Sequence, residues 1–140
     1  MMKYLLVEDE RFAYEEIKRM MQALRADYQM IGWAESVEQA VGFLKQGNID
    51  LMIVDIRLSD GISFEIFEQC PIEIPVIFTT AYDEYALKAF KVNSIDYLLK
   101  PIDEKELDAA LCKFERRNYL NCTMPEYKKL EETYLSNNKK

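Results

Sequence analysis

Leu51-Met52-Ile53-Val54-Asp55 is the stretch that decides the fold, because four apolar residues run without interruption into a carboxylate. Such a run, without alternating polar residues, is typical of a parallel strand that helices cover on both faces. Similar short runs lie on either side of it in the chain, and segments with apolar residues at spacings of three and four separate them. This alternation predicts βαβ units and therefore an α/β fold around a parallel sheet. The predicted strands are residues 4–7, 30–34, 51–54, 76–79 and 97–99.

Two of the predicted helices carry start signals. Ser36 is followed by Gln39, and Asp103 by Glu106, at the spacing of a capping box. In a capping box each of the two side chains accepts a hydrogen bond from a backbone N–H that has no partner within the helix. We therefore expect helices to begin directly after Ser36 and Asp103.

The alternation of strands and helices stops beyond residue 117. Beyond it, Thr123-Met124-Pro125 leads into a last segment at 127–135 with apolar residues at helical spacing. We expect one domain at residues 1–117 and a linker helix at 118–140. The alternatives for this tail are that it folds back on the domain, pairs with a second copy, or is a partly disordered end.

Composition excludes several functional classes. The 140 residues carry a formal net charge of −7, so the chain is repelled by nucleic acid and by anionic membranes, and any DNA contact has to come from elsewhere. Histidine is absent, which excludes catalytic triads and metal sites that use it. The three cysteines lack metal-site spacing, and no stretch is long enough to be a signal peptide or a membrane span. We expect a cytoplasmic protein without a membrane partner.

Polar side chains stand at the carboxyl ends of the predicted strands. The first strand runs into Glu8 and Asp9, the third into Asp55, the fourth into Thr80 and the fifth into Lys100. In parallel α/β sheets ligands bind outside these strand ends. We therefore expect three carboxylates, a hydroxyl and an ammonium group to converge on one edge of the sheet.

The chemistry of this set points to phosphate. Clustered carboxylates repel one another unless a cation lies among them, and hard oxygen ligands favour Mg²⁺, which keeps coordination places for phosphate oxygens. Asp55 ends the central strand and is the expected nucleophile, forming an acyl phosphate. Lys100, the Thr80 hydroxyl and the backbone N–H of Ala81 are expected to hold the oxygens of the transferred group.

Four motifs together resemble the receiver family of bacterial two-component response regulators. They are Val7-Glu8-Asp9-Glu10, Ile53-Val54-Asp55-Ile56-Arg57-Leu58, Thr79-Thr80-Ala81 and Lys100-Pro101. The segments 78–86 and 89–101 are similar, more narrowly, to receivers joined to LytTR-type DNA-binding domains, as in LytR/AgrA-like regulators. The resemblance implies a flavodoxin-like, doubly wound sheet with strand order 2-1-3-4-5. It also implies a signalling switch, not an enzyme, although such a switch catalyses its own phosphorylation and dephosphorylation.

The same resemblance implies roles for individual residues. Asp55 accepts a phosphoryl group from a sensor histidine kinase. Mg²⁺ is held by Glu8, Asp9, Asp55 and the backbone carbonyl of Arg57. Thr80 and Lys100 bind the phosphoryl group, and a cis peptide precedes the proline that follows the lysine.

A switch is implied as well, in which Thr80 moves toward the new phosphoryl group and Tyr97 turns inward. The surface that responds is made by the fourth helix, the fifth strand and the fifth helix, where we expect a homodimer. Its expected contacts include Tyr85, Lys88, Lys91 and Asp96. Because LytTR-type regulators continue into an output domain that controls transcription, we expect this chain to be a truncated form, with DNA bound only through the missing domain.

Two other classes compete with this interpretation. A Mg²⁺-dependent phosphohydrolase would also use an aspartate nucleophile, but it needs a general acid or base, and the nearest candidate is Asp60. A receiver-like module that dimerises without phosphorylation is the other. The joint presence of Asp9, Asp55, Thr80 and Lys100 argues against that module.

Overall fold

The protein is built around a parallel sheet of five strands, seen in a computed structural model that describes residues 2–70, 73–81 and 94–122, with the backbone alone for 118–122. The strands are β1 (Lys3–Val7), β2 (Gln29–Ala34), β3 (Leu51–Asp55), β6 (Val76–Thr80) and β7 (Ser94–Leu99). Their order is β2-β1-β3-β6-β7, and each neighbouring pair is parallel. This is the predicted order 2-1-3-4-5, because β4 and β5 lie outside the sheet.

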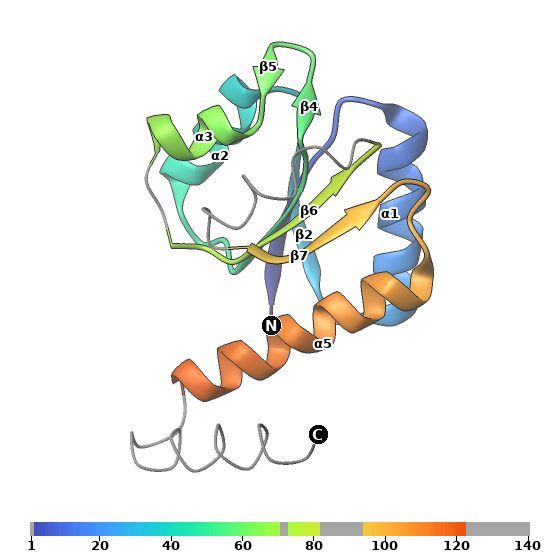
Figure 1. Cartoon of the computed structure of the whole chain (residues 1–140). Helices are drawn as coiled ribbons and strands as arrows, with labels where there is room; N and C mark the ends of the chain where they lie inside the picture. The colour runs from blue at the N-terminus through green and yellow to red at the C-terminus, as the bar shows by residue number, and fades with distance from the viewer. Residues whose placement is uncertain (1, 71–72, 82–93, 123–140) are drawn as a thin grey trace.

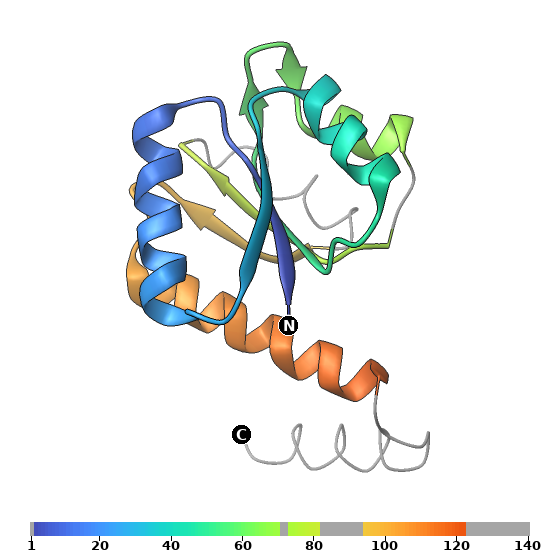
Figure 2. The same ribbon diagram turned by 180° about the vertical axis from the view of Figure 1, so that it is seen from behind.

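Helices cover both faces of the sheet (Figures 1 and 2). They are α1 (Arg11–Leu24), α2 (Val37–Gln46), α3 (Phe64–Gln69) and α5 (Glu104–Cys122). Alternate strand residues point to opposite layers: Val54 packs into the core under α2 and α3, whereas Ile53 packs into the core under α1 and α5. Both layers are apolar, which explains why the central strand shows no polar alternation. A further helical segment predicted between β6 and β7 lies outside the described residues.

All five strands extend beyond their predicted ends, and β1 and β2 each start one residue earlier, at Lys3 and Gln29. The last strand starts at Ser94, three residues before the predicted start, because Ser94 already pairs with Val76. Asp55 belongs to β3 and pairs with Thr79, and Thr80 is the last residue of β6. The prediction missed these residues because it followed apolar character, whereas strand pairing depends on the backbone.

The capping box predicted at the first turn of α2 is confirmed in part. The Gln39 N–H donates to Ser36 Oγ at 3.1 Å. The reciprocal bond differs, because Gln39 Oε1 accepts from the backbone N–H of Glu35 at 2.8 Å and not from that of Ser36. Helix α5 starts at Glu104 as predicted and continues to Cys122, across the boundary expected at residue 117. That boundary stays a prediction, and residues 123–140 lie outside the described part.

A small antiparallel hairpin that was not predicted follows Asp55 directly. It pairs β4 (Arg57–Leu58) with β5 (Gly61–Ile62). Strands of two residues are too short to show a period in the sequence. The return strand begins at Gly61, whose φ of 150° lies where residues with side chains are rarely found. Because it follows β3 directly, the hairpin projects from the edge of the sheet where β3 ends (Figure 1).

Charged contacts tie the end of α1 to α5 at the other end of the molecule. The Arg25 guanidinium donates two hydrogen bonds to Glu115, from Nε to Oε2 at 2.6 Å and from Nη2 to Oε1 at 3.1 Å. Its Nη1 donates a third to Asp108 Oδ1 at 2.9 Å. Tyr28 also donates to Glu115, and its ring lies edge-on to the fully buried Phe114. Burial raises the pKa of Glu115, but the bonds from Arg25 and Tyr28 outweigh it and lower the pKa overall. These contacts fix α5 across the sheet.

Candidate functional site

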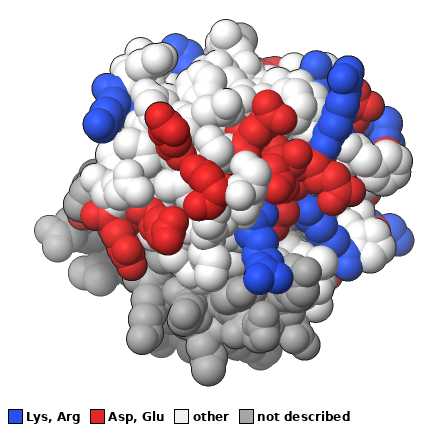
Figure 3. Space-filling view, turned by 90° about the horizontal axis from the view of Figure 1, so that it is seen from above, with Lys and Arg blue, Asp and Glu red and all other residues white. Residues whose placement is uncertain are grey.

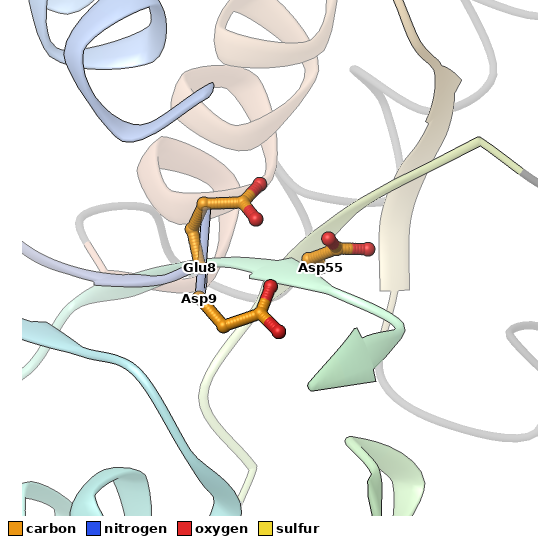
Figure 4. Close-up of side chains that lie close together, drawn as sticks. All are labelled: Glu8, Asp9 and Asp55. Atoms are coloured by element: carbon orange, nitrogen blue, oxygen red, sulfur yellow. The ribbon is translucent and has the colours of Figure 1, made fainter. Parts of the chain in front are cut away.

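Three carboxylates meet where β1 and β3 end. Glu8 and Asp9 follow β1, and Asp55 ends β3, with one oxygen of each lying within 4.8 Å of the others (Figure 4). Glu8 is 0% exposed and Asp55 7%, whereas Asp9 is exposed. Acidic side chains gather near the middle of this face, with basic side chains beside them (Figure 3). Two buried carboxylates so close together need compensating charge.

Lys100 supplies part of that charge. It follows β7, and its Nζ lies 2.7 Å from Glu8 Oε1 and 2.9 Å from Asp55 Oδ2. Burial lowers the pKa of Lys100, but the hydrogen bonds to both carboxylates outweigh it and raise the pKa. The backbone N–H of Lys100 also donates to Thr80 O at 2.7 Å, and the peptide bond to Pro101 is cis, as the family resemblance implied. One lysine therefore links the ends of four strands.

Glu8 is the most perturbed acid of the site. Burial raises its pKa to about 7, helped by the negative charge of Asp55 and opposed by Lys100. The backbone N–H of Glu10 also donates to Glu8 Oε2, at 3.2 Å. At neutral pH the Glu8 carboxyl group is thus poised between its protonated and ionised forms.

Trp33 holds the turn that carries the acidic pair, a role that sequence reasoning missed. Its indole N–H donates to the backbone carbonyl of Glu8 at 2.6 Å. Its ring stacks on Tyr14 of α1, with centroids 3.8 Å apart and planes 10° from parallel. In the sequence, a tryptophan at the end of a predicted strand indicates only a packing residue. Only the pairing of β1 with β2 shows that it lies beside Glu8.

The other expected site residues lie around this centre. Thr80 is fully buried at the end of β6, and Ala81 is exposed directly after it. Arg57 is exposed, and its backbone N–H donates to Asp55 Oδ1 at 3.4 Å. Tyr97 is half-buried and packs against the core under α2 and α3. The structure thus brings Glu8, Asp9, Asp55 and Lys100 into contact distance, with the remaining residues on adjoining strand ends.

Asp60 is engaged elsewhere. Its two carboxylate oxygens accept hydrogen bonds from the backbone N–H groups of Val37 and Glu38 in the first turn of α2. This contact disfavours Asp60 as the general acid or base of a phosphohydrolase. Of the expected dimer contacts, Asp96 forms an ion pair with Lys113 of α5 at 3.1 Å. The other three residues lie outside the described part of the chain.

The donor set fits a small divalent cation. One oxygen of each of the three carboxylates lies within 4.8 Å of the others, so the three are grouped closely enough to approach one ion. Carboxylate oxygens are the hard donors that this ion selects. The burial of Glu8 and Asp55 separates this cluster from ordinary exposed acidic groups.

Comparison with known proteins agrees with the fold and the motifs. The response regulator receiver domain profile matches residues 4–112. The chain is 38% identical over 120 residues to the sensory transduction protein LytT of Bacillus cereus, which covers 84% of this chain and 48% of LytT. It is 36% identical over 113 residues to the transcriptional regulatory protein BtsR of Salmonella typhi, covering 79% of this chain and 47% of BtsR.

Solved structures give the same answer. The response regulatory domain of protein mrkE from Klebsiella pneumoniae superposes with a TM-score of 0.73 at 28% identity, covering 83% of this chain and 97% of that domain. The chain spans about half the length of the curated relatives it matches. Among residues 2–70, 73–81 and 94–122, no helix has the length and apolar character needed to cross a membrane. The chain belongs to the receiver domain family of two-component response regulators, similar to LytT and LytR.

Proposed function

We propose that this receiver domain is a phosphorylation-activated switch and that Asp55 accepts the phosphoryl group. One observation carries the proposal. The Asp55 carboxylate lies almost buried at the end of the central strand, with Lys100 Nζ 2.9 Å from one oxygen and two more carboxylates within 4.8 Å. Buried like charges held together at a strand end lower the stability of the fold, and such sites are typically functional.

The proposed step is a direct transfer. An Asp55 oxygen attacks phosphorus, and an oxygen–phosphorus bond forms as the bond from phosphorus to the donor breaks. With a sensor histidine kinase the leaving group is the imidazole nitrogen of the phosphohistidine, which then takes up a proton. With acetyl phosphate it is acetate. Lys100, already in contact with Asp55, places positive charge beside the incoming phosphoryl oxygens.

Mg²⁺ is the proposed cofactor. Glu8, Asp9, Asp55 and the backbone carbonyl of Arg57 would hold it, and when bound it supplies positive charge that offsets the phosphoryl oxygens. The carboxylates present fit this ion in type and are grouped at one strand edge. The hydrogen bond of Trp33 to the Glu8 carbonyl orients the turn that carries two of these ligands.

The proposed output is control of transcription. Phosphorylation would reposition Thr80 and Tyr97, alter the surface made by the fourth helix, β7 and α5, and promote a homodimer there. A relative named as a transcriptional regulatory protein and the greater length of the relatives support an output domain that acts on transcription, and we propose that it is of LytTR type. Residues 1–117 would then form the cytoplasmic receiver and 118–140 the link to that domain.

Acetyl phosphate labelling tests the proposed function. In Mg²⁺ we expect the chain to gain the mass of one phosphoryl group, and in EDTA to gain almost none, because charge compensation is lost. Intact mass spectrometry measures the product. A label that forms equally well in EDTA contradicts the role of Mg²⁺, and no label in Mg²⁺ contradicts the switch.

Mg²⁺ affinity is expected to rise with pH. Metal binding needs ionised carboxylates, and the Glu8 pKa of about 7 means that this ligand is mostly protonated at pH 6 and mostly ionised at pH 8. We expect Mg²⁺ to bind roughly tenfold more tightly at pH 8 than at pH 6, with release of a proton below pH 7. The fluorescence of Trp33, the only tryptophan of the sequence, can report the titration, since its indole bonds the Glu8 carbonyl.

The variant Glu8→Gln is the control for this titration. It has no titrating group at this position, so its weaker affinity should vary much less between pH 6 and pH 8. An equally steep pH dependence in this variant contradicts the assignment to Glu8.

A further inference from the structure

We propose that Asp60 is a positioning residue of the phosphorylation site, and that its carboxylate clamps the β4–β5 hairpin to the first turn of α2. The inference deepens the proposed function and rests on it, because the hairpin carries Arg57, whose carbonyl is a proposed Mg²⁺ ligand. Asp60 itself contacts neither the metal nor the reacting atoms in this proposal. It acts through the backbone of the hairpin.

The clamp consists of contacts between segments more than twenty residues apart. Asp60 Oδ1 accepts from the Val37 N–H at 2.8 Å, and Oδ2 accepts from the Glu38 N–H at 3.2 Å. Beside it, Ser59 Oγ donates to the backbone carbonyl of Glu35 at 3.3 Å. Ser59 and Asp60 form the turn between β4 and β5, so the tip of the hairpin is fastened to the β2–α2 connection.

Helix α2 does not depend on Asp60 alone for its capping. The next two N–H groups are satisfied within the same segment, because Gln39 N donates to Ser36 Oγ and Ala40 N to Ser36 O. Asp60 therefore completes the first turn with a side chain from another element, in addition to the local cap. Asp60 thus does more than cap α2, because it joins this helix to the hairpin that follows Asp55.

The hairpin is also fixed at its base. Ser63 N donates to Ile56 O at 2.7 Å, and Ile56 N donates to Thr79 O of β6 at 3.1 Å. Arg57 lies between this base and the clamped tip, with its own N–H directed to Asp55 Oδ1. With both ends held, the Arg57 carbonyl has a defined place relative to Asp55. Releasing the tip frees one end of the two-strand hairpin.

Metal affinity responds to such support. Groups that orient metal ligands without touching the metal commonly change affinity by about 10–100-fold. An unclamped hairpin must be ordered when the ion binds, and this ordering weakens binding. Linkage also works in reverse: if the clamp favours Mg²⁺ binding, Mg²⁺ must strengthen the bonds of Asp60 to Val37 and Glu38.

Isothermal titration calorimetry of the 140-residue chain with magnesium chloride alone tests the clamp. We expect Asp60→Ala to weaken Mg²⁺ binding about tenfold. Asp60→Asn keeps one acceptor oxygen and therefore one of the two hydrogen bonds to α2, so its loss of affinity should be clearly smaller than that of Asp60→Ala. Ser36→Ala is the matched control, because it removes a cap from the same turn of α2 without releasing the hairpin, and its affinity should stay within about twofold of the wild type.

A second readout follows amide hydrogen exchange. In the wild type, Mg²⁺ should slow exchange at Val37 and Glu38, which lie on α2 and outside the proposed metal site. In Asp60→Ala this response should be lost, while in Ser36→Ala it should persist. A residue that only stabilised the helix would not make these amides respond to the metal.

Three results would overturn the clamp. They are unchanged Mg²⁺ affinity in Asp60→Ala, a loss in Asp60→Asn as large as in Asp60→Ala, and an equal loss in Ser36→Ala. The second would mean that the hydrogen bond that asparagine can still accept does not hold the hairpin, and the third that any fraying of α2 suffices. Failure of the phosphorylation proposal is separate, since it would appear as a wild type that binds Mg²⁺ but takes no phosphoryl group from acetyl phosphate.

Discussion

Asp55→Asn is expected to abolish phosphoryl incorporation from acetyl phosphate, leaving no detectable mass gain under conditions in which the wild type is labelled. The amide oxygen is a poor nucleophile and cannot form an acyl phosphate. The fold should persist, because an amide oxygen can still accept the hydrogen bond that Asp55 Oδ2 receives from Lys100 at 2.9 Å. Removing one of the three clustered charges also relieves repulsion with buried Glu8. Intact mass measurement of both proteins in parallel decides the result.

Asp9→Asn is the matched control for that experiment. It also removes one carboxylate from the cluster, but it leaves the acceptor and its contact with Lys100 in place. Labelling should slow and need more Mg²⁺, yet still reach the acceptor. If Asp55→Asn is labelled as fully as the wild type, the phosphoryl group resides on another residue and the central assignment is wrong.

Lys100→Met is expected to destabilise the metal-free protein by about 3 kcal/mol at pH 8.5, because it leaves buried charge without its partner. The loss should be smaller, about 1–2 kcal/mol, at pH 5.5, where chiefly the charged hydrogen bond to Asp55 is lost. The difference arises at Glu8, whose pKa in the fold is about 7 against an ordinary value of 4.5. Urea unfolding in EDTA at both pH values measures the two losses.

The sign of this pH dependence follows from proton binding. Between 4.5 and the folded pKa, the folded state holds a proton on Glu8 that the unfolded state has released, so stability falls as pH rises through this range. Without Lys100 the folded pKa rises further and the decline extends to higher pH. The variant therefore loses more stability than the wild type between pH 7 and 8.5.

A double-mutant cycle with Glu8→Gln isolates this effect. In the Glu8→Gln background, Lys100→Met should cost nearly the same free energy at pH 5.5 and 8.5, because the titrating group is gone. Equal losses at the two pH values in the native background would show that the contact of Lys100 with Glu8 contributes little.

Sequence patterns predicted the sheet and the centre of the site for one physical reason. Parallel strands covered on both faces are continuous apolar runs, and their carboxyl ends share one edge, so residues such as Asp55 and Lys100 are brought together by topology. The structure confirms the fold and places Glu8, Asp9, Asp55 and Lys100 together. Their chemical roles stay predictions that the experiments above test.

The parts that sequence patterns did not predict depend on contacts between distant segments. The indole of Trp33 reaches the carbonyl of Glu8 across 25 residues, and Asp60 reaches Val37 across 23. Neither contact has a periodic signal, because hydrophobic periodicity reports only which face of an element is buried. The hairpin that carries Asp60 is likewise too short to be periodic. Such supporting contacts become visible only when the register of β1, β2 and β3 is known.

The contacts between Arg25 and α5 set a practical limit for anyone who wishes to transplant this module into a chimeric regulator. The family match ends at residue 112, yet Phe114 is 0% exposed and Glu115 receives bonds from both Arg25 and Tyr28. A cut at the edge of the match would remove a core aromatic ring and the anchor of the last helix. The transplantable unit is therefore longer than the family match indicates, and a fusion joint belongs after residue 115.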